Sequence, residues 1–361
     1  PEFSGEWEMV SLQDIATINP KSDPLQNTFI YIDLEAVEKG ELRKIQEIMR
    51  EEAPSRAQRV IDNNDILFQC VRPYQKNNYI HRILNTSNQQ WVASTGYAQI
   101  RTTELPNYIY HLLNTDEFNR KVMVRCTGSS YPAINSEDLA TIHLYYTPDK
   151  KEQLKISRLL DLLDKRIATQ NKIIEKLQSL IKGLRVCCMQ RVYGNNVYLS
   201  EIAQIYQPQT ISSTELTEDG FLVYGANGII GKYKDYNHET EQICITCRGN
   251  TCGMVNYTKP MSWITGNAMV INTDKYQDKV CKRYLYHYLS AYNFNSIISG
   301  SGQPQIVRTP LEKLKITLPT ISEQKQKAII FDKIQDKIDI NHKVLNLYIG
   351  QKQYLLRQMF I

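Results

Sequence analysis

The sequence predicts an α+β fold in which two pseudo-repeated α/β domains are joined by two long helices that form an antiparallel coiled coil. Three observations predict it: weak internal matches that follow the same order in both halves, strand-like runs that precede a helix each time, and heptad patterns near residues 150–191 and 320–361. The 361 residues suffice for two domains with separate cores. We therefore expect a first head over residues 1–149 and a second head over residues 192–319, each followed by one of these helices.

The internal matches indicate a duplication. "VSLQDIATI" at residues 10–18 returns as "VYLSEIAQI" at 197–205, and "YIYHLLNTDEFN" from residue 108 resembles "YLYHYLSAYNFN" from residue 284. "GSSYPAINSEDLATIHL" from residue 128 follows the pattern of "GSGQPQIVRTPLEKLKI" from residue 300. The separation varies from match to match, as expected when loops change length around a kept framework.

Each head begins with short strand-like runs, such as "DILFQCV" and "QICITC", which are interrupted by Gly, Pro and Asn. The helices then start with capping signals just after a proline. Asp149 with Glu152 and Thr320 with Glu323 both fit a capping box.

The two helical segments carry heptad seams over about four repeats, which is typical of a coiled coil. The first seam is Ile156, Leu160, Leu163, Ile167, Gln170, Ile174, Leu177, Ile181, Leu184 and Cys188. Adding 171 to each number gives the second seam, from Lys327 to Met359. Gln170 and Asn341 are the matching polar positions at the middle of the seams, and their pairing would fix the helix register. The alternative is that each helix packs only on its own head.

The charge is unevenly distributed. The whole chain has a net charge of +5, but residues 150–191 carry eleven Lys/Arg against four Asp/Glu, which is +7. A basic stripe along one helix indicates a polyanionic partner, although it is also compatible with a solvated helix face.

No catalytic motif is found, and the search argues against an enzyme. "GANGIIGKY" from residue 225 has the wrong spacing for a phosphate-binding loop, and Tyr233 stands where Ser or Thr is needed. Cys244, Cys247 and Cys252 lack the second ligand pair of a zinc site, so we interpret them as core cysteines and expect no metal. His111 and His287 are repeat equivalents in amphipathic helices and are expected to pack or to contact a partner.

The eight cysteines show no disulfide framework, which favours a reducing cytoplasm. No apolar run is long enough to span a bilayer and no signal peptide opens the chain, so we expect no membrane association.

At this point the motifs resemble those of the specificity subunit of type I restriction-modification systems. The resemblance lies in "VSLQDIATI", in "CRGNTCG" followed by "WITGNAMVI", in "GSGQPQI", and in "LPTISEQKQKAI" before the last helix, and it covers both halves. The first half departs from these motifs with "CVRPYQKNN" and "TPDKKEQ".

The resemblance implies that the heads are target recognition domains 1 and 2, each reading one half of a bipartite site on double-stranded DNA. It implies that the helices set the unread spacer and dock two modification subunits, with restriction subunits joining through the complex. The chain then has no catalysis and no cofactor of its own, because the partner modification subunit binds S-adenosylmethionine and methylates adenine N6. From Ile156 to Leu184 the first seam spans about 42 Å, on the order of 12 base pairs.

Arg and Lys contact DNA phosphates, whereas Arg, Asn, Gln, Ser and Thr contact base edges. In the first head we predict as DNA-binding residues Arg72, Gln75, Lys76, Asn77, Ser129, Ser130 and Tyr131. In the second head we predict Lys232, Arg248, Asn250, Thr251, Gln303 and Gln305. The alternative is that the glycine-rich segments only form turns.

Two other functions are weighed against DNA reading. A self-sufficient modification or cleavage enzyme conflicts with the missing motifs. A non-catalytic coiled-coil scaffold with protein-binding heads is opposed mildly by the basic central helix and the polar loops.

Overall fold

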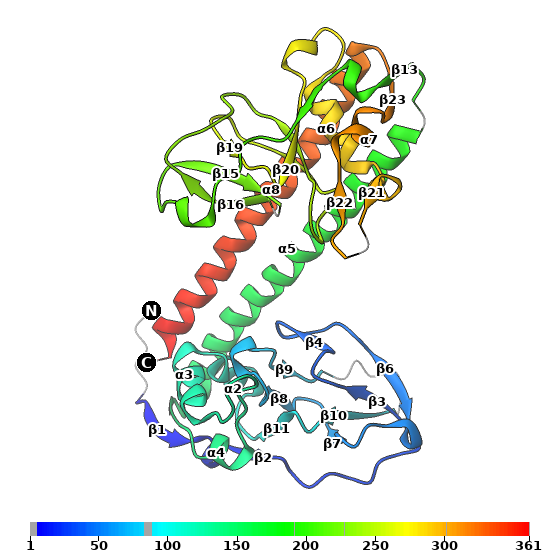
Figure 1. Cartoon of the computed structure of the whole chain (residues 1–361). Coiled ribbons are helices and arrows are strands. Elements are labelled where there is room, and N and C mark those ends of the chain that lie inside the picture. The colour runs from blue at the N-terminus through cyan, green and yellow to red at the C-terminus, as the bar shows by residue number, and fades with distance from the viewer. Residues whose placement is uncertain (1–5, 83–88, 191, 227, 301, 361) are drawn as a thin grey trace. The chain divides into compact units, whose positions relative to one another are not determined.

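The computed structural model describes residues 6–82, 89–190, 192–226, 228–300 and 302–360. The chain divides into two compact units: unit 1 is Pro1–Gln170 with Val344–Ile361, and unit 2 is Asn171–Lys343. Helices α5 (Lys150–Gln190) and α8 (Ile321–Met359) each contribute one segment to each unit (Figure 1).

In the described part of unit 1, strands pair in the orders β2-β11-β8-β9, β6-β3-β10-β7, β1-β12 and β4-β5. Residues of β8 are buried without alternation, as expected of a strand covered on both faces. The strand bounds are β1 Glu8–Ser11, β2 Ala16–Ile18, β3 Thr28–Ile32, β4 Val37–Glu38, β5 Glu41–Leu42, β6 Gln46–Met49, β7 Ala57–Ile61, β8 Ile66–Gln69, β9 Tyr79–Ile80, β10 Gln90–Ser94, β11 Tyr97–Thr102 and β12 His143–Tyr146.

Helices α1 (Leu12–Ile15), α2 (Pro106–Leu113), α3 (Asp116–Arg125) and α4 (Ser136–Ala140) cover the first of these sheets, and side chains from both build the largest core of unit 1. The helices begin where their sequences provide caps. The Phe118 amide donates to Thr115 Oγ1 at 3.2 Å, and the Asp138 amide donates to Asn135 Oδ1 at 2.7 Å.

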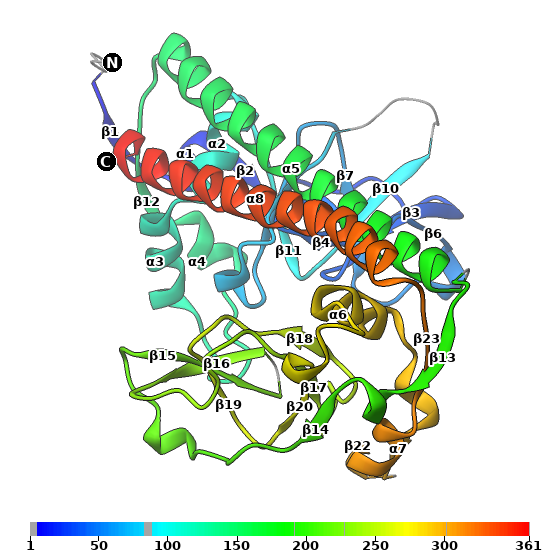
Figure 2. The ribbon, with the colours of Figure 1, turned by 90° about the horizontal axis from the view of Figure 1, so that it is seen from above.

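In the described part of unit 2, strands pair in the orders β14-β20-β17-β18, β16-β15-β19, β13-β23 and β21-β22. Helix α6 (Lys282–Ala291) lies between the first of these sheets and the unit's segments of α5 and α8 (Figure 2), and α7 (Arg308–Glu312) precedes β23. The strand bounds are β13 Asn195–Tyr198, β14 Gln204–Tyr206, β15 Phe221–Gly225, β16 Gly228–Tyr233, β17 Ile243–Thr246, β18 Val255–Tyr257, β19 Trp263–Ile264, β20 Ala268–Asn272, β21 Ile298–Ser299, β22 Gln305–Ile306 and β23 Lys315–Leu318.

The two units repeat one plan. The order β2-β11-β8-β9 corresponds to β14-β20-β17-β18, the β1-β12 pair to β13-β23, and α2 to α6. The predicted α+β class, with two pseudo-repeated domains and two long helices, is confirmed. Helix α5 is described as far as Gln190, and residue 191, the predicted end of this helix, lies outside the described residues. The boundaries of the heads as functional domains stay predictions.

A repeated glutamine joins each head to its long helix. Gln153 Oε1 accepts from the Leu105 amide at 3.4 Å and its Nε2 donates to the Thr147 carbonyl at 2.8 Å. Gln324 does the same with the Cys281 amide at 2.8 Å and the Pro319 carbonyl at 3.0 Å. Both side chains are buried, so each glutamine fixes the start of a long helix against the head helix.

One predicted capping box forms and the other is wrong. The Thr320 amide donates to the Glu323 carboxylate at 3.0 Å, and the Glu323 amide donates to Thr320 Oγ1 at 3.4 Å, so this box is complete. Asp149 Oδ1 instead accepts from the Lys151 amide at 2.8 Å, while Glu152 accepts from Thr147 Oγ1 at 3.2 Å. The Glu152 carboxylate, which the predicted box needs as an acceptor for the Asp149 amide, is instead bonded to the Thr147 hydroxyl.

Within unit 1, the beginning of α5 packs against the end of α8. Lys352 Nζ lies 2.5 Å from Asp164 Oδ1, and the Arg166 guanidinium lies 5.7 Å from the centre of the Tyr348 ring. The partner number falls as the α5 number rises, so these segments are antiparallel. Lys352 occupies a position of the predicted seam where an apolar residue is expected, and the Asp164 carboxylate neutralises its charge.

Within unit 2, the end of α5 packs against the beginning of α8 through the predicted seam. One cluster contains Leu177, Ile181, Leu184, Cys188, Phe331, Ile334 and Ile338. Gln170 and Asn341 are each 8% exposed. They belong to different units, so their predicted role in fixing the helix register stays a prediction.

Candidate nucleic-acid interface

In the first head, two predicted loops meet after strand β8. The β8–β9 turn (residues 70–78) and the Gly128 loop (residues 127–133) are joined by a bond from the Ile134 amide to the Cys70 carbonyl, 3.1 Å. The Arg72 amide donates to the Pro132 carbonyl at 2.8 Å, and its guanidinium lies 4.2 Å from the centre of the Tyr131 ring. Ser129, Ser130 and Tyr131 are exposed, so the loops present a stacked Arg–Tyr pair beside two hydroxyls.

The other predicted residues of this turn hold it in place. Gln75 Oε1 accepts from Gln69 Nε2 at 3.0 Å, and Asn77 Oδ1 accepts from the Lys39 amide at 3.0 Å. Lys76 Nζ lies 2.8 Å from Asp116 Oδ1. These contacts use the acceptors of both amides and neutralise the lysine, which leaves Arg72 as the cation of the turn best able to reach a ligand.

In the second head, the equivalent loops meet in the same way. The Ile306 amide donates to the Cys247 carbonyl at 3.0 Å, and the Gly249 amide donates to the Pro304 carbonyl at 3.0 Å. The predicted side chains that the structure leaves exposed there are Arg248, Asn250, Gln303 and Gln305. Thr251 Oγ1 instead donates to the Ala226 carbonyl at 2.9 Å.

Lys232 is not part of this group. It lies on β16 opposite Leu222, and its Nζ is 3.4 Å from Asp219 Oδ1. Ala226, which contacts Thr251, belongs to the turn at the other end of the same hairpin. Of the predicted set, the structure therefore brings together one arginine and several polar side chains in each head, with Arg72 half-buried and Arg248 exposed.

The cysteines of "CITC" lie in separate cores. Cys244 of β17 packs with Tyr224 and Ile264, whereas Cys247, the residue after β17, packs in the core that contains Leu285, so the two thiols lie on opposite faces of the sheet. Burial raises the pKa of Cys244 to about 12 and also raises that of Cys247. Neutral thiols on opposite faces cannot share a metal ion, which supports the interpretation as core residues.

His111 and His287 each bind an aspartate of a long helix. His111 Nε2 lies 2.8 Å from Asp161 Oδ1 on α5, and His287 Nε2 lies 2.8 Å from Asp332 Oδ1 on α8. Both rings are 0% exposed. Burial, offset in part by Asp332, lowers the pKa of His287 and favours a neutral ring. The aspartates are also 171 residues apart, a signal in the sequence that was missed.

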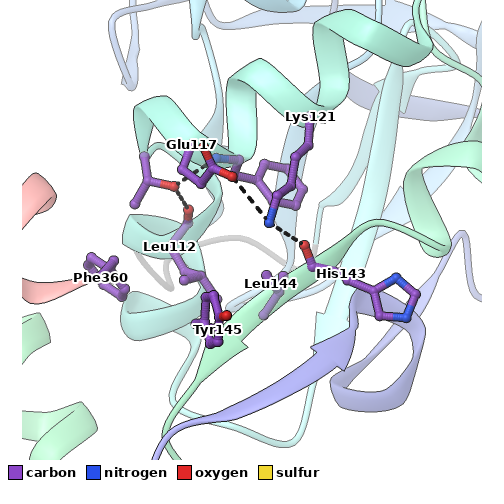
Figure 3. A pocket seen from close by; sticks show the side chains of 9 residues that line it. Leu112, Glu117, Lys121, His143, Leu144, Tyr145 and Phe360 are labelled. Carbon is purple, nitrogen blue, oxygen red and sulfur yellow. Dashed lines mark hydrogen bonds and ion pairs between the residues drawn. The ribbon is translucent and has the colours of Figure 1, made fainter.

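A pocket in unit 1 lies between α2, α3 and β12 (Figure 3). Leu112, Leu144 and Phe360 line it, and the Lys121 Nζ reaches across to the His143 carbonyl at 3.1 Å. Its volume of about 20 Å³ accommodates about one water molecule. The pocket is a packing gap, and it does not provide room for a substrate.

The paired loops and long helices occur once in each half, and the comparison with known families shows the same division. The model of the type I restriction modification DNA specificity domain matches residues 4–179 and again residues 195–347. The chain belongs to this family.

Two relatives of this specificity-domain chain are themselves named specificity subunits. The type I restriction enzyme EcoprrI specificity subunit of Escherichia coli is 31% identical over 147 residues, which is 39% of this chain and 36% of that protein. The HindI specificity subunit of Haemophilus influenzae is 23% identical over 187 residues, 50% of this chain and 37% of that protein. The aligned segments thus span little more than a third of each relative.

Two solved structures share the fold of this family member. The S subunit of a type I restriction-modification system from M. genitalium has a TM-score of 0.68 at 16% identity, covering 100% of this chain and 97% of that one. A chain from a study of assembly and conformational transition of the type I R-M system has a TM-score of 0.60 at 20% identity, covering 99% and 97%. Among the described residues, no helix is long and apolar enough to cross a membrane.

Proposed function

We propose that this chain is the DNA sequence-specificity subunit of a type I restriction-modification complex. The first and second heads are target recognition domains, each of which reads one half of a bipartite site on double-stranded DNA. The observation that carries the proposal is the double match to the DNA specificity domain, because each match contains one head with the same pair of meeting loops.

The loops have the chemistry needed for reading DNA. Each head presents an exposed or aromatic-stacked arginine, Arg72 or Arg248, next to short polar side chains. Arginine forms paired hydrogen bonds with guanine or with phosphate, and the smaller side chains contact either base edges or the backbone. Two separate loop pairs suit a site in two halves.

The helices α5 and α8 set the spacer and dock two modification subunits, and restriction subunits join through the complex. Support comes from apolar side chains that the coiled-coil seam does not use. Exposed examples are Leu162 at 56% and Leu180 at 48% on α5, and Ile330 at 55%, Ile340 at 53% and Leu347 at 71% on α8. Apolar positions exposed along a helix are typical of a protein interface.

The subunit carries no catalysis of its own. Adenine N6 methylation and the binding of S-adenosylmethionine belong to the modification subunits, and the complex acts on DNA in the cytoplasm. A non-catalytic subunit needs surfaces that bind DNA and partner subunits, which the paired loops and exposed helix faces provide. The small pocket beside Phe360 is not used in a reaction.

The proposal is tested by mapping methylation. The chain is co-expressed with the modification subunit of its system in a host without other adenine methylation, and N6-methyladenine is located across the genome. We expect a split motif with a fixed unread gap. If a co-purified complex that binds S-adenosylmethionine leaves no such motif, the proposal is wrong and a protein-binding scaffold becomes the better explanation.

A further inference from the structure

Arg59 is a half-buried cation of the first head that no predicted motif includes. It lies in the edge strand β7, opposite Ala93 of β10, with its backbone fixed in the sheet. The adjacent residue Val60 is held on both sides, because its amide donates to Ser22 Oγ at 3.2 Å and its carbonyl accepts from Gln99 Nε2 at 2.9 Å. The side chain therefore leaves a rigid part of the domain.

The guanidinium of Arg59 has one buried donor that is unpaired among the described residues. Its Nε is buried and without a hydrogen-bond acceptor. The titratable group that acts on it is the Cys70 thiol, and burial raises the pKa of Cys70 to about 11, so this thiol is uncharged at neutral pH. Burial lowers the pKa of Arg59 itself, but a guanidinium stays protonated at neutral pH. The first head thus contains a cation with one buried donor for which the described residues supply no acceptor.

Such an arrangement opposes folding. Other arginines of the same head are paired: Arg101 lies 2.5 Å from Asp62 and 2.7 Å from Asp65, and Arg43 lies 2.9 Å from Glu41. A buried donor without an acceptor costs stability, and this cost calls for an explanation outside the folded chain itself.

The position of Arg59 points to its ligand. The Cys70 carbonyl accepts the hydrogen bond that joins the β8–β9 turn to the Gly128 loop, and Arg72 follows two residues later. Arg59 lies opposite Ala93, and three residues after Ala93 the Gly96 carbonyl accepts from the Cys70 amide at 3.0 Å, so the end of β10 connects the strand of Arg59 to the place where the two loops meet. We propose that Arg59 is a further DNA-contacting residue of the first head, whose guanidinium donates to acceptors of bound DNA. This rests on the proposed function.

The test uses the full chain in complex with its modification subunits and a duplex that carries the mapped site. In Arg59→Met the apolar stem is kept and the charge is lost, whereas Arg59→Lys keeps the charge without the paired donors. Arg43→Met removes one paired positive charge from the same head and serves as the control. Dissociation constants are measured over a salt series, and unfolding temperatures are measured for each chain.

We expect Arg59→Met to weaken duplex binding about tenfold or more, with Arg59→Lys between it and wild type and Arg43→Met unchanged. The unfolding temperature of Arg59→Met should equal or exceed that of wild type, because an unpaired charge has been removed. A contact with a phosphate would weaken all sequences equally and reduce the salt slope by about 1. A contact with a base edge would make one base pair of one half-site tolerant to change.

Equal binding by Arg59→Met and wild type would overturn the inference. The inference would also be overturned if both Arg59 variants unfolded at lower temperature than wild type and lost binding only to the extent that they are less folded. Arg59 would then be a structural residue. Failure of the wild-type complex to bind any duplex is a different result, and it would overturn the proposed function first.

Discussion

Single polar residues at equal positions of the two repeats connect each head to its helices. Gln153 and Gln324 bond the first turn of a long helix to the head, and His111 and His287 bind its aspartates a few turns later. The sequence pointed to the histidines as repeats, and the equal spacing of their aspartates was available but missed. The partners of the glutamines could not be predicted, because a backbone amide such as that of Cys281 has no signature in a sequence.

His81 makes the stability of unit 1 depend on pH. Its ring is 0% exposed, 4.8 Å from that of Trp91 between centroids, and neither nitrogen has a hydrogen-bond partner among described residues. Burial lowers its pKa to about 4, below the unfolded value of about 6.5. The neutral ring therefore contributes fully above pH 6.5, and its contribution is lost as the pH falls from 6.5 to 4.

His81→Phe should remove this dependence while keeping the aromatic packing. Between pH 7.5 and 4.5, wild type should lose roughly 2 to 3 kcal/mol of unfolding free energy more than the variant does. Urea unfolding at both pH values measures the difference, with the exposed His143→Gln as control. An identical pH dependence of wild type and His81→Phe would show that the ring does not stay neutral in the folded chain.

Arg72 and Arg248 both lie on loops, and each of these loops meets a second predicted loop of its own head. That their side chains contact DNA stays a prediction. Lys76 is neutralised by Asp116, which comes from a helix forty residues later, and a pattern of loop residues does not reveal that pairing. Arg59 was missed for the opposite reason: it lies in a strand, where an arginine is expected to be solvated.

At the scale of elements, the heptad seams were predicted closely, because apolar residues spaced alternately three and four positions apart share one face only in a helix. The seam residues of α5 and α8 form the cluster found in unit 2. The order of the strands was outside the reach of the sequence. Strands of two to six residues pair through backbone bonds, so their neighbours depend on tertiary packing.

The helices also give a prediction for the spacer. One heptad inserted after Gln170 together with one after Asn341 keeps the antiparallel seams matched and adds about 10 Å. We expect the unread gap in the methylated motif to lengthen by about 3 base pairs. Methylation mapping of the variant reads this directly.

An insertion in α5 alone serves as the control, because it shifts one seam against the other and should reduce methylation altogether. A gap of unchanged length in the doubly extended chain would refute the idea that the helices set the spacer.

At the scale of the whole molecule, the duplication was visible in the sequence and organises everything else. Both repeats of the family domain contain corresponding sheets, a pair of loops that meet, and a buried histidine bonded to an aspartate of a long helix. The loops themselves differ, with a stacked Arg72 and Tyr131 in one head and exposed glutamines in the other. Equal frameworks with unequal loops are what two independent reading heads require.

The most direct test of two independent heads is an exchange of residues 192–319 for the corresponding residues of a relative with a different site, followed by methylation mapping. The framework strands β13 and β23 begin and end this segment, so the exchange keeps their pairing. We predict that one half of the methylated motif changes to that of the relative while the other half and the gap stay the same. A change in both halves would contradict the existence of two separately reading heads.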